Sequence, residues 1–220
     1  MFIATIALAI SGWWFVRNAM LYGVPDFFGW ARHDAVVIGQ PTTSDWIARE
    51  GLRPLIERFL VFTFHSFWAQ FGWLGVLIDA RLYRLLFVFT LLILMGVAIL
   101  AIRRVRTSIG LDSYQKRALA LLGVILLLVM GSYIGYNRRF VQHQGRYLFP
   151  AIPSLALLFA LGLAEWTYIG ARFLARLPLN PYPEFWRSRA EAIALAAVYV
   201  GLVALDLISL YGFIIPQLRR

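Results

Sequence analysis

The chain has 220 residues, of which 61% are hydrophobic, 16% aromatic and only 15% charged. Soluble domains are about 45–50% apolar and about a quarter charged, so this composition excludes a disordered chain, a nucleic-acid module and an ordinary cytosolic enzyme. The lack of cysteine excludes disulfides and thiolate chemistry, and a net charge of +10 makes lipid headgroups and phosphates the expected partners. We predict an integral membrane protein with an all-α fold, a polytopic bundle of about five transmembrane helices.

Five apolar stretches are candidates for membrane spans, since a hydrocarbon core about 30 Å thick needs about 20 helical residues. Residues 1–22 have no basic n-region and do not resemble a signal peptide; they look like a helix whose upstream context is missing or which starts abruptly. Pro150 and Pro153 fit the first turns of the fourth span, where proline is tolerated. The other predicted spans are residues 82–102, 118–136, 148–171 and 190–215.

Charge in the connections sets the predicted orientation. Residues 103–117 carry five basic side chains and one acidic one, which places this connection in the cytoplasm by the positive-inside rule. Alternation then puts residues 23–81 and 137–147 outside. The second of these segments has three arginines and no acid, on the side where basic charge is disfavoured. Either the topology is inverted or these arginines are kept outside to bind an anion.

The external segment 23–81 is too long for a plain loop, and such segments usually carry structure or function. Ser44 is a reasonable N-cap, with Asp45 in the first turn. The apolar residues that follow recur at spacings of three and four. This pattern predicts an amphipathic, interfacial helix over residues 44–71, kinked at Pro54.

Aromatic residues dominate the end of this segment. Seven of the fifteen residues 59–73 are aromatic, which is typical of the headgroup boundary. Residues 59–78 are also nearly long enough to span. Two alternatives remain: an interfacial or re-entrant segment that reverses at Gly72 and Gly75, or a further transmembrane helix.

The sharpest motif is Gln-Gly-Arg-Tyr-Leu-Phe-Pro at residues 144–150. A basic residue and a tyrosine meet the membrane at a glycine turn, and a proline then starts a helix. Such arginines are able to grip a phosphate bidentately; the alternative is snorkelling arginines beside a belt tyrosine. The candidate residues here are Arg138, Arg139, Gln144, Arg146 and Tyr147.

Two other motifs add candidates. Trp14, Arg17 and Asn18 form either a stacking and hydrogen-bonding rim for a sugar or lipid head, or an aromatic belt with one snorkelled cation. The aromatic stretch contains a histidine that acts either as a base or ligand contact, or as a partnered polar residue. The three histidines of the chain lack ligand spacing, so no metal site is predicted. The candidates from the aromatic stretch are His65, Trp68, Gln70 and Trp73.

Carboxylates are the remaining candidates. Asp206 lies alone within the last predicted span, where a charge costs at least a few kcal/mol. It either faces a cavity or partner, or hydrogen-bonds a neighbouring helix. No motif marks any external carboxylate as a base, so the catalytic residue stays unassigned. The external carboxylates considered are Asp26, Asp34, Asp45 and Asp79.

The order of these motifs resembles a known family. A Trp-Trp-x-x-Arg-Asn helix end, a Tyr-Gly-x-Pro turn, a Ser-Phe-Trp-x-x-Phe-Gly-Trp segment and Gln-Gly-Arg-Tyr-Leu-Phe-Pro follow one another over roughly residues 12–164. Together they resemble the C-terminal half of bacterial membrane proteins of the DUF2142 type. Those proteins are similar to GT-C glycosyltransferases, such as the dolichyl-phosphate mannosyltransferase and aminoarabinose transferase families.

The resemblance implies transfer of a sugar from a polyprenyl-phosphate carrier to an acceptor, outside the bacterial inner membrane, by inverting displacement with a carboxylate base. Arg146, with Arg138 or Arg139, then binds the phosphate of the lipid-linked sugar, which is the donor substrate; no other cofactor is implied. That family carries its catalytic acid in an N-terminal half that is not seen here. The resemblance therefore implies a piece of a larger unit, or a partner chain that supplies the missing half.

Three hypotheses follow. The first is the C-terminal portion of a GT-C-like glycosyltransferase, which leaves open whether this chain alone is an enzyme. The second is a non-catalytic membrane subunit or scaffold that packs against lipid or a partner chain. The third hypothesis is a transporter. Transporters usually have internal repeats and several charges within their spans, whereas this sequence shows no repeat and only one such charge, Asp206.

Overall fold

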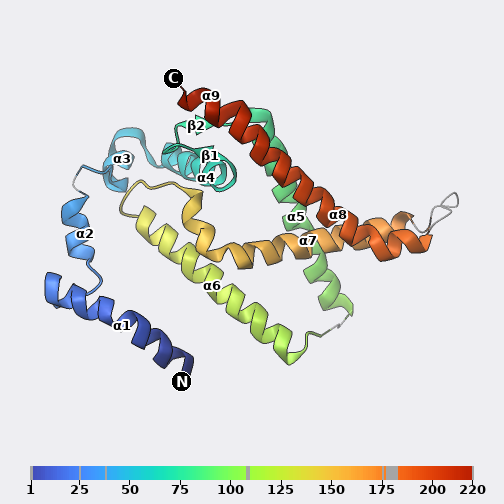
Figure 1. Cartoon of the computed structure of the whole chain (residues 1–220), viewed down its shortest axis with the longest axis horizontal. Helices are drawn as coiled ribbons and strands as arrows, with labels where there is room; N and C mark the ends of the chain where they lie inside the picture. The colour runs from blue at the N-terminus through green and yellow to red at the C-terminus, as the bar shows by residue number, and fades with distance from the viewer. Residues whose placement is uncertain are drawn as a thin grey trace.

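Helices make up almost all of the computed structural model, which describes residues 2–24, 26–37, 39–107, 110–174, 176 and 183–219 (Figure 1). This confirms the predicted all-α fold. A 3₁₀ turn, η1 (Gly145–Ala151), leads into α7, and a π-helical segment, η2 (Ser209–Ile214), joins α8 to α9. The helices are α1 (Phe2–Tyr22), α2 (Trp30–Val36), α3 (Thr43–Glu50), α4 (Leu52–Trp68), α5 (Ala80–Thr107), α6 (Ser113–Asn137), α7 (Ile152–Leu174), α8 (Pro183–Ile208) and α9 (Ile215–Leu218).

Four helical stretches among the described residues are long and apolar enough to cross a membrane. The chain is therefore an integral membrane protein. These stretches contain the last four predicted spans. Helix α1 forms where the first span was predicted but is not one of the four, so its crossing stays a prediction. The four stretches are Ala80–Thr107, Ser113–Asn137, Gly145–Leu174 and Arg189–Leu218.

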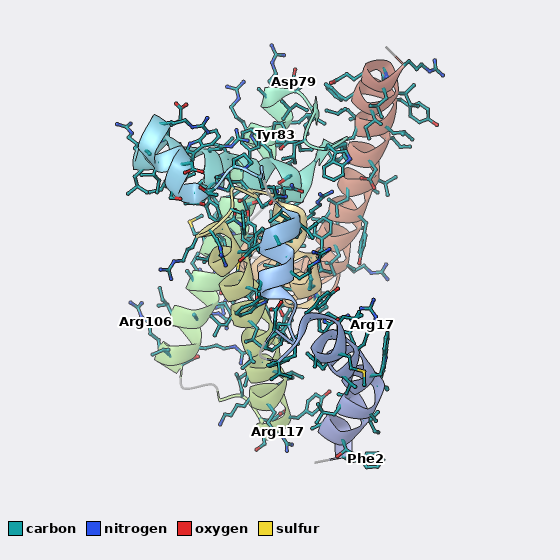
Figure 2. All side chains as sticks on the ribbon, turned by 90° about the vertical axis from the view of Figure 1, so that its left-hand side faces the viewer. Phe2, Arg17, Asp79, Tyr83, Arg106 and Arg117 are labelled. Atoms are coloured by element: carbon teal, nitrogen blue, oxygen red, sulfur yellow. The ribbon has the colours of Figure 1, made fainter. Side chains whose placement is uncertain are left out.

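The four long helices run back and forth between two ends of the bundle. We call basal the end at which α5 ends, α6 begins, α7 ends and α8 begins, at the lower and right-hand side of Figure 1. The opposite, upper end carries α3, α4, residues 137–145 and the C-terminus. Figure 2 likewise places Arg106 and Arg117 far from Asp79 and Tyr83. This alternation agrees with the predicted order of spans.

Helices α5 and α7 approach closely at two glycines. A Cβ on Gly96 would collide with the carbonyl oxygen of Gly162, and a Cβ on Gly162 would collide with that of Ile93. Small residues permit this kind of close approach between membrane helices. Toward the basal end, Arg103 donates two hydrogen bonds to the buried Glu165 carboxylate, at 2.8 and 2.6 Å. A glycine contact and a buried ion pair thus hold α5 and α7 together.

The predicted helix 44–71 is wrong in its bounds and in its kink. Thr42, not Ser44, is the N-cap, and its side chain accepts a hydrogen bond from the Asp45 backbone N–H at 3.1 Å. The helix breaks at Gly51, whose φ of 89° favours glycine, so that α3 and α4 are separate. Pro54 lies in the first turn of α4, where proline is tolerated, and therefore does not kink a continuous helix.

A short hairpin follows α4. Strands β1 (Gln70–Phe71) and β2 (Val76–Leu77) pair antiparallel, and the turn between them includes Gly72 at a φ of 54°. The predicted reversal is therefore confirmed, and residues 59–78 do not form one continuous helix. The Tyr83 hydroxyl donates to the Ala69 carbonyl at 2.7 Å, which fastens the hairpin to the start of α5.

Candidate functional site

Gly145 positions the 144–150 motif by direct backbone contact with α4. Its N–H donates to the Ser66 hydroxyl oxygen at 2.7 Å. A Cβ at this position would collide with the Thr63 carbonyl oxygen and the Phe67 amide nitrogen. Only glycine allows the chain to enter η1 this close to α4. Gly145 is therefore explained by its packing against α4.

The 3₁₀ geometry of η1 then divides the motif between two hollows. Residues three apart lie on the same side of a 3₁₀ turn. Arg146 and Phe149 accordingly line one cavity, which faces the hairpin, while Tyr147 and Pro150 line a groove along α6. The motif thus forms the wall that the two hollows share.

The cavity at Arg146 has a volume of about 310 Å³. Its other lining residues come from the end of α4 and from the hairpin, and none of the described residues that line it is acidic. The guanidinium carbon of Arg146 lies 5.6 Å from the ring centre of Trp73 and 5.8 Å from that of Tyr147. Arg146 is therefore an exposed cation against two aromatic rings, with no carboxylate in its cavity.

The hairpin supplies polar and stacking groups to the same cavity. Gln70 donates from Nε2 to the Leu74 carbonyl at 2.8 Å, and its buried Oε1 has no hydrogen-bond partner among the described residues. The Trp73 side chain is 89% exposed. Gln70 and Trp73 therefore line the same cavity as Arg146, and their role in ligand binding stays a prediction.

Two other candidates from the aromatic stretch have structural contacts. Trp68 lines the cavity but also packs its ring against Phe89 and Phe159, at ring-centre distances of 6.3 and 5.8 Å. The His65 ring stacks on Tyr83 at 3.7 Å, and its burial lowers the pKa of His65. Both side chains hold α4 against α5, and His65 does not line the cavity.

The groove on the other side of η1 is largely apolar and has a volume of about 620 Å³. Tyr147, which lines this groove, follows Arg146 directly in the chain, so η1 contributes neighbouring residues to the groove and to the cationic cavity. The sequence analysis did not identify this groove, because its residues are ordinary for a membrane span and share no motif. Its lining is Leu128, Val129, Ser132, Tyr133, Tyr136, Tyr147 and Pro150.

Arg138 and Arg139 line a different cavity, of about 390 Å³, together with Asp34. Arg139 forms an ion pair with Asp34 at 2.6 Å. Asp34 also contacts the His33 ring at 3.4 Å, and the other ring nitrogen of His33 lies 3.2 Å from the Tyr136 hydroxyl. The structure therefore separates these two arginines from Arg146 and neutralises Arg139. Sequence analysis considered Asp34 but had no signal for its partners.

Gln144 is buried rather than available to a ligand. Its side chain is 7% exposed and donates to the Gln142 side-chain oxygen at 2.9 Å. The neighbouring His143 is 4% exposed, and burial, reinforced by the charge of Arg58, lowers the pKa of His143 to about 4. Gln144 and its neighbour His143 are therefore both buried, and Gln144 is not available to a ligand.

The α1 candidates do not join the Arg146 cavity. Trp14 and Arg17 are exposed on α1, and the Arg17 guanidinium donates to the buried Asn18 side-chain oxygen at 3.4 Å. Figure 1 shows α1 at the lower left, apart from the hairpin. Asp206 is exposed on α8, within the stretch Arg189–Leu218. The described residues include no group of three or more histidines and carboxylates able to hold a metal ion.

Comparison with known proteins gives no assignment: no protein-family model matches the chain, and neither a curated protein nor a solved structure matches it. The site must therefore be interpreted from its own geometry.

Proposed function

We propose that the chain is the C-terminal, membrane-embedded portion of a GT-C-like glycosyltransferase and that it binds a polyprenyl-phosphate-linked sugar at its upper end. In this proposal the upper end faces outward from a bacterial inner membrane. The observation that carries it is the Arg146 guanidinium, which lies against Trp73 in a cavity whose described lining has no acid. A cation left without a carboxylate at the membrane boundary is suited to an anionic ligand.

The two hollows on either side of η1 fit the two parts of such a ligand. The cationic cavity offers Arg146 for the phosphate and the exposed Trp73 ring as a stacking face for the sugar. The apolar groove along α6 offers Leu128 and Val129 to the isoprenoid chain. A ligand with a polar head and an apolar tail would cross η1 between Arg146 and Tyr147.

The proposed reaction needs Arg146 in this cavity and a carboxylate base from a segment outside it. In an inverting transfer the acceptor oxygen forms a bond to the anomeric carbon, and the bond from that carbon to the phosphate oxygen breaks. The carrier phosphate leaves with the bonding electron pair, and Arg146 stabilises the charge that develops on it. The acceptor proton goes to a carboxylate base. We assign that base to a segment outside this cavity, since no described lining residue is acidic.

Binding of a radiolabelled polyprenyl phosphate to the full chain in uncharged detergent tests the proposal. A hydrogen bond to a charged group contributes about 1.5–3 kcal/mol, so R146Q should weaken binding about tenfold to a hundredfold. R146K keeps the charge but loses the bidentate geometry and should be intermediate. The matched control is R138Q, an exposed arginine of the other cavity, which should change affinity less than about twofold. Equal affinity of R146Q and the wild-type chain would refute the proposal.

A membrane subunit or scaffold is the second candidate, and Asp206 is the observation that favours it. A carboxylate exposed on the surface of a spanning helix is costly in lipid and is stabilised by a partner helix. Cross-linking of a cysteine at position 206 to another membrane chain in native membranes, together with unchanged polyprenyl-phosphate binding in R146Q, would favour this function over the first.

A further inference from the structure

A separate cavity lies at the basal end, between α7 and α8, and the proposed function does not use it. Its volume is about 620 Å³. Small side chains of both helices leave the space open, and hydroxyl and charged groups face it from the last turns of α7 and the beginning of the α8 span. The residues that matter are Thr167, Tyr168, Arg172, Arg176 and Glu191.

The described residues that line this cavity carry a net positive charge, and the buried carboxylate on α7, Glu165, is already paired. Glu165 accepts both of its hydrogen bonds from Arg103 and is 1% exposed, so it does not neutralise Arg172. Arg172 instead donates to the Tyr168 hydroxyl at 2.6 Å. Neither Arg172 nor Arg176 forms an ion pair with a described residue. Among the described lining residues Glu191 is the one acid beside these two cations, so their formal charges sum to +1.

The Tyr168 ring brings two guanidinium groups to one place. The guanidinium carbon of Arg103 lies 4.5 Å from its ring centre, and that of Arg172 lies 5.5 Å from it. The contact with Tyr168 orients the planar fork of Arg172 at the cavity wall, where it is able to donate two parallel hydrogen bonds to a phosphate. The Thr167 hydroxyl, which donates to the Ala164 carbonyl at 2.9 Å, still has lone pairs to accept from a ligand.

The position of the cavity and the apolar side chains near it suit the headgroup of a lipid. It opens at the ends of two membrane-spanning stretches, where headgroups lie. Beside it, Phe173 on α7 is 65% exposed and Ile193 on α8 is 45% exposed, and both belong to the apolar outer surface that acyl chains cover. A soluble phosphate would use the cations but not these apolar side chains.

We infer that this cavity binds the phosphate of an anionic phospholipid such as phosphatidylglycerol. The phosphate takes Arg172 and Arg176, and Glu191 accepts a hydrogen bond from a hydroxyl of the headgroup. The charge of +1 on the described lining residues selects a headgroup with a net negative charge over a zwitterionic one. The bound lipid fills the gap between α7 and α8 and joins the two helices at the basal end.

Native mass spectrometry of the full chain in uncharged detergent, titrated with single phospholipids, tests this inference. Phosphatidylglycerol should bind about tenfold more tightly than phosphatidylcholine, and R172Q/R176Q should remove this preference. R176Q alone, at an exposed position after the end of α7, should weaken phosphatidylglycerol binding at least about threefold without disturbing the fold. The matched control, R106Q/R117Q, removes the same charge at the same end and should change affinity less than about twofold.

Three results would overturn the inference. An equal loss of binding in R106Q/R117Q would mean that general surface charge holds the lipid. Equal affinity for phosphatidylethanolamine would mean that Glu191 pairs with an ammonium group and that the lipid is zwitterionic. Displacement of phosphatidylglycerol by inorganic phosphate at millimolar concentration would mean that the cavity is a site for a soluble anion.

Discussion

Replacement of Gly145 by alanine is the most direct test of how the Arg146 cavity is built. The added Cβ would collide with backbone atoms of Thr63 and Phe67 in the C-terminal half of α4, and backbone atoms of a helix cannot rotate away as a side chain can. Forcing η1 off α4 costs about 1–3 kcal/mol as overpacking, and loss of the hydrogen bond to Ser66 costs about 1 kcal/mol more. We therefore expect G145A to destabilise the protein by about 2–4 kcal/mol.

The assay is thermal unfolding in uncharged detergent, followed by tryptophan fluorescence. For a chain of this size about 1 kcal/mol lowers the midpoint by about 2–4 °C, so G145A should unfold about 4–16 °C below the wild type. The matched control is G131A on α6, where an added Cβ meets no atom within 4 Å and alanine favours the helix by about 1 kcal/mol. G131A should therefore unfold at or above the wild-type midpoint. A G145A midpoint equal to that of G131A would refute the contact between η1 and α4.

Two further predictions concern buried charge. Removal of the Glu165 carboxylate in E165Q leaves Arg103 without its partner. Breaking a fully buried pair costs about 3–5 kcal/mol, and because Arg103 is 33% exposed the loss should be smaller, about 2–3 kcal/mol. A thermal midpoint unchanged within error would contradict the pairing. His143 has a folded-state pKa of about 4, below the usual value of 6.5, so between these pH values the unfolded chain binds more protons than the folded chain. Stability should therefore fall by about 3 kcal/mol as the pH is lowered from 6.5 to 4, and this part of the pH dependence should disappear in H143N; an identical pH dependence in H143N would show that His143 is not its source.

The sequence predicted the fold class and the last four spans because both depend on local composition. Twenty apolar residues in a row have few alternatives to a membrane helix, whatever the rest of the chain does. The reversal at Gly72 was also predictable from residue type, because glycine adopts a positive φ readily, although Trp73 and Leu74 in the same turn have positive φ as well. These features required no knowledge of which segments meet in space.

The start of α3 shows why the bounds of the interfacial helix were not predictable. Ser44 and Thr42 are both acceptable N-caps by residue type. Thr42 is the N-cap because the next residue, Thr43, is bound to the end of α6. The Thr43 N–H donates to the Arg139 carbonyl at 3.0 Å, and the Thr43 hydroxyl donates to the Asn137 carbonyl at 2.8 Å. These partners are about ninety residues away, and no local pattern encodes them.

The residues of the candidate site were only partly predictable, because a motif does not show how its residues pack. Arg146, Gln70 and Trp73 belong to two motifs that the hairpin and η1 bring to one cavity. Gln144 sits inside one of these motifs and is nevertheless buried, because its neighbour Gly145 draws the backbone against α4. A motif specifies which residues are close in sequence, but the packing of its glycine decides which of them a ligand can reach.

The ion pairs also bear on the three arginines of residues 137–147, which lie on the side where the positive-inside rule disfavours basic residues. One of them, Arg139, forms an ion pair with Asp34 at 2.6 Å. At the basal end Glu165 neutralises Arg103, and the only acid of the α5–α6 connection, Asp112, caps α6. Among the described residues of these two connections, two basic side chains remain without an acidic partner at the upper end and four at the basal end. The two at the upper end are Arg138 and Arg146, and the four at the basal end are Arg104, Arg106, Lys116 and Arg117. The positive-inside rule counts basic residues whether or not they are paired, so residues 103–117, with five of them, remain the predicted cytoplasmic connection. The arginines that suggested an anion-binding site narrow to Arg138 and Arg146, and of these two only Arg146 lies in a cavity whose described lining has no carboxylate.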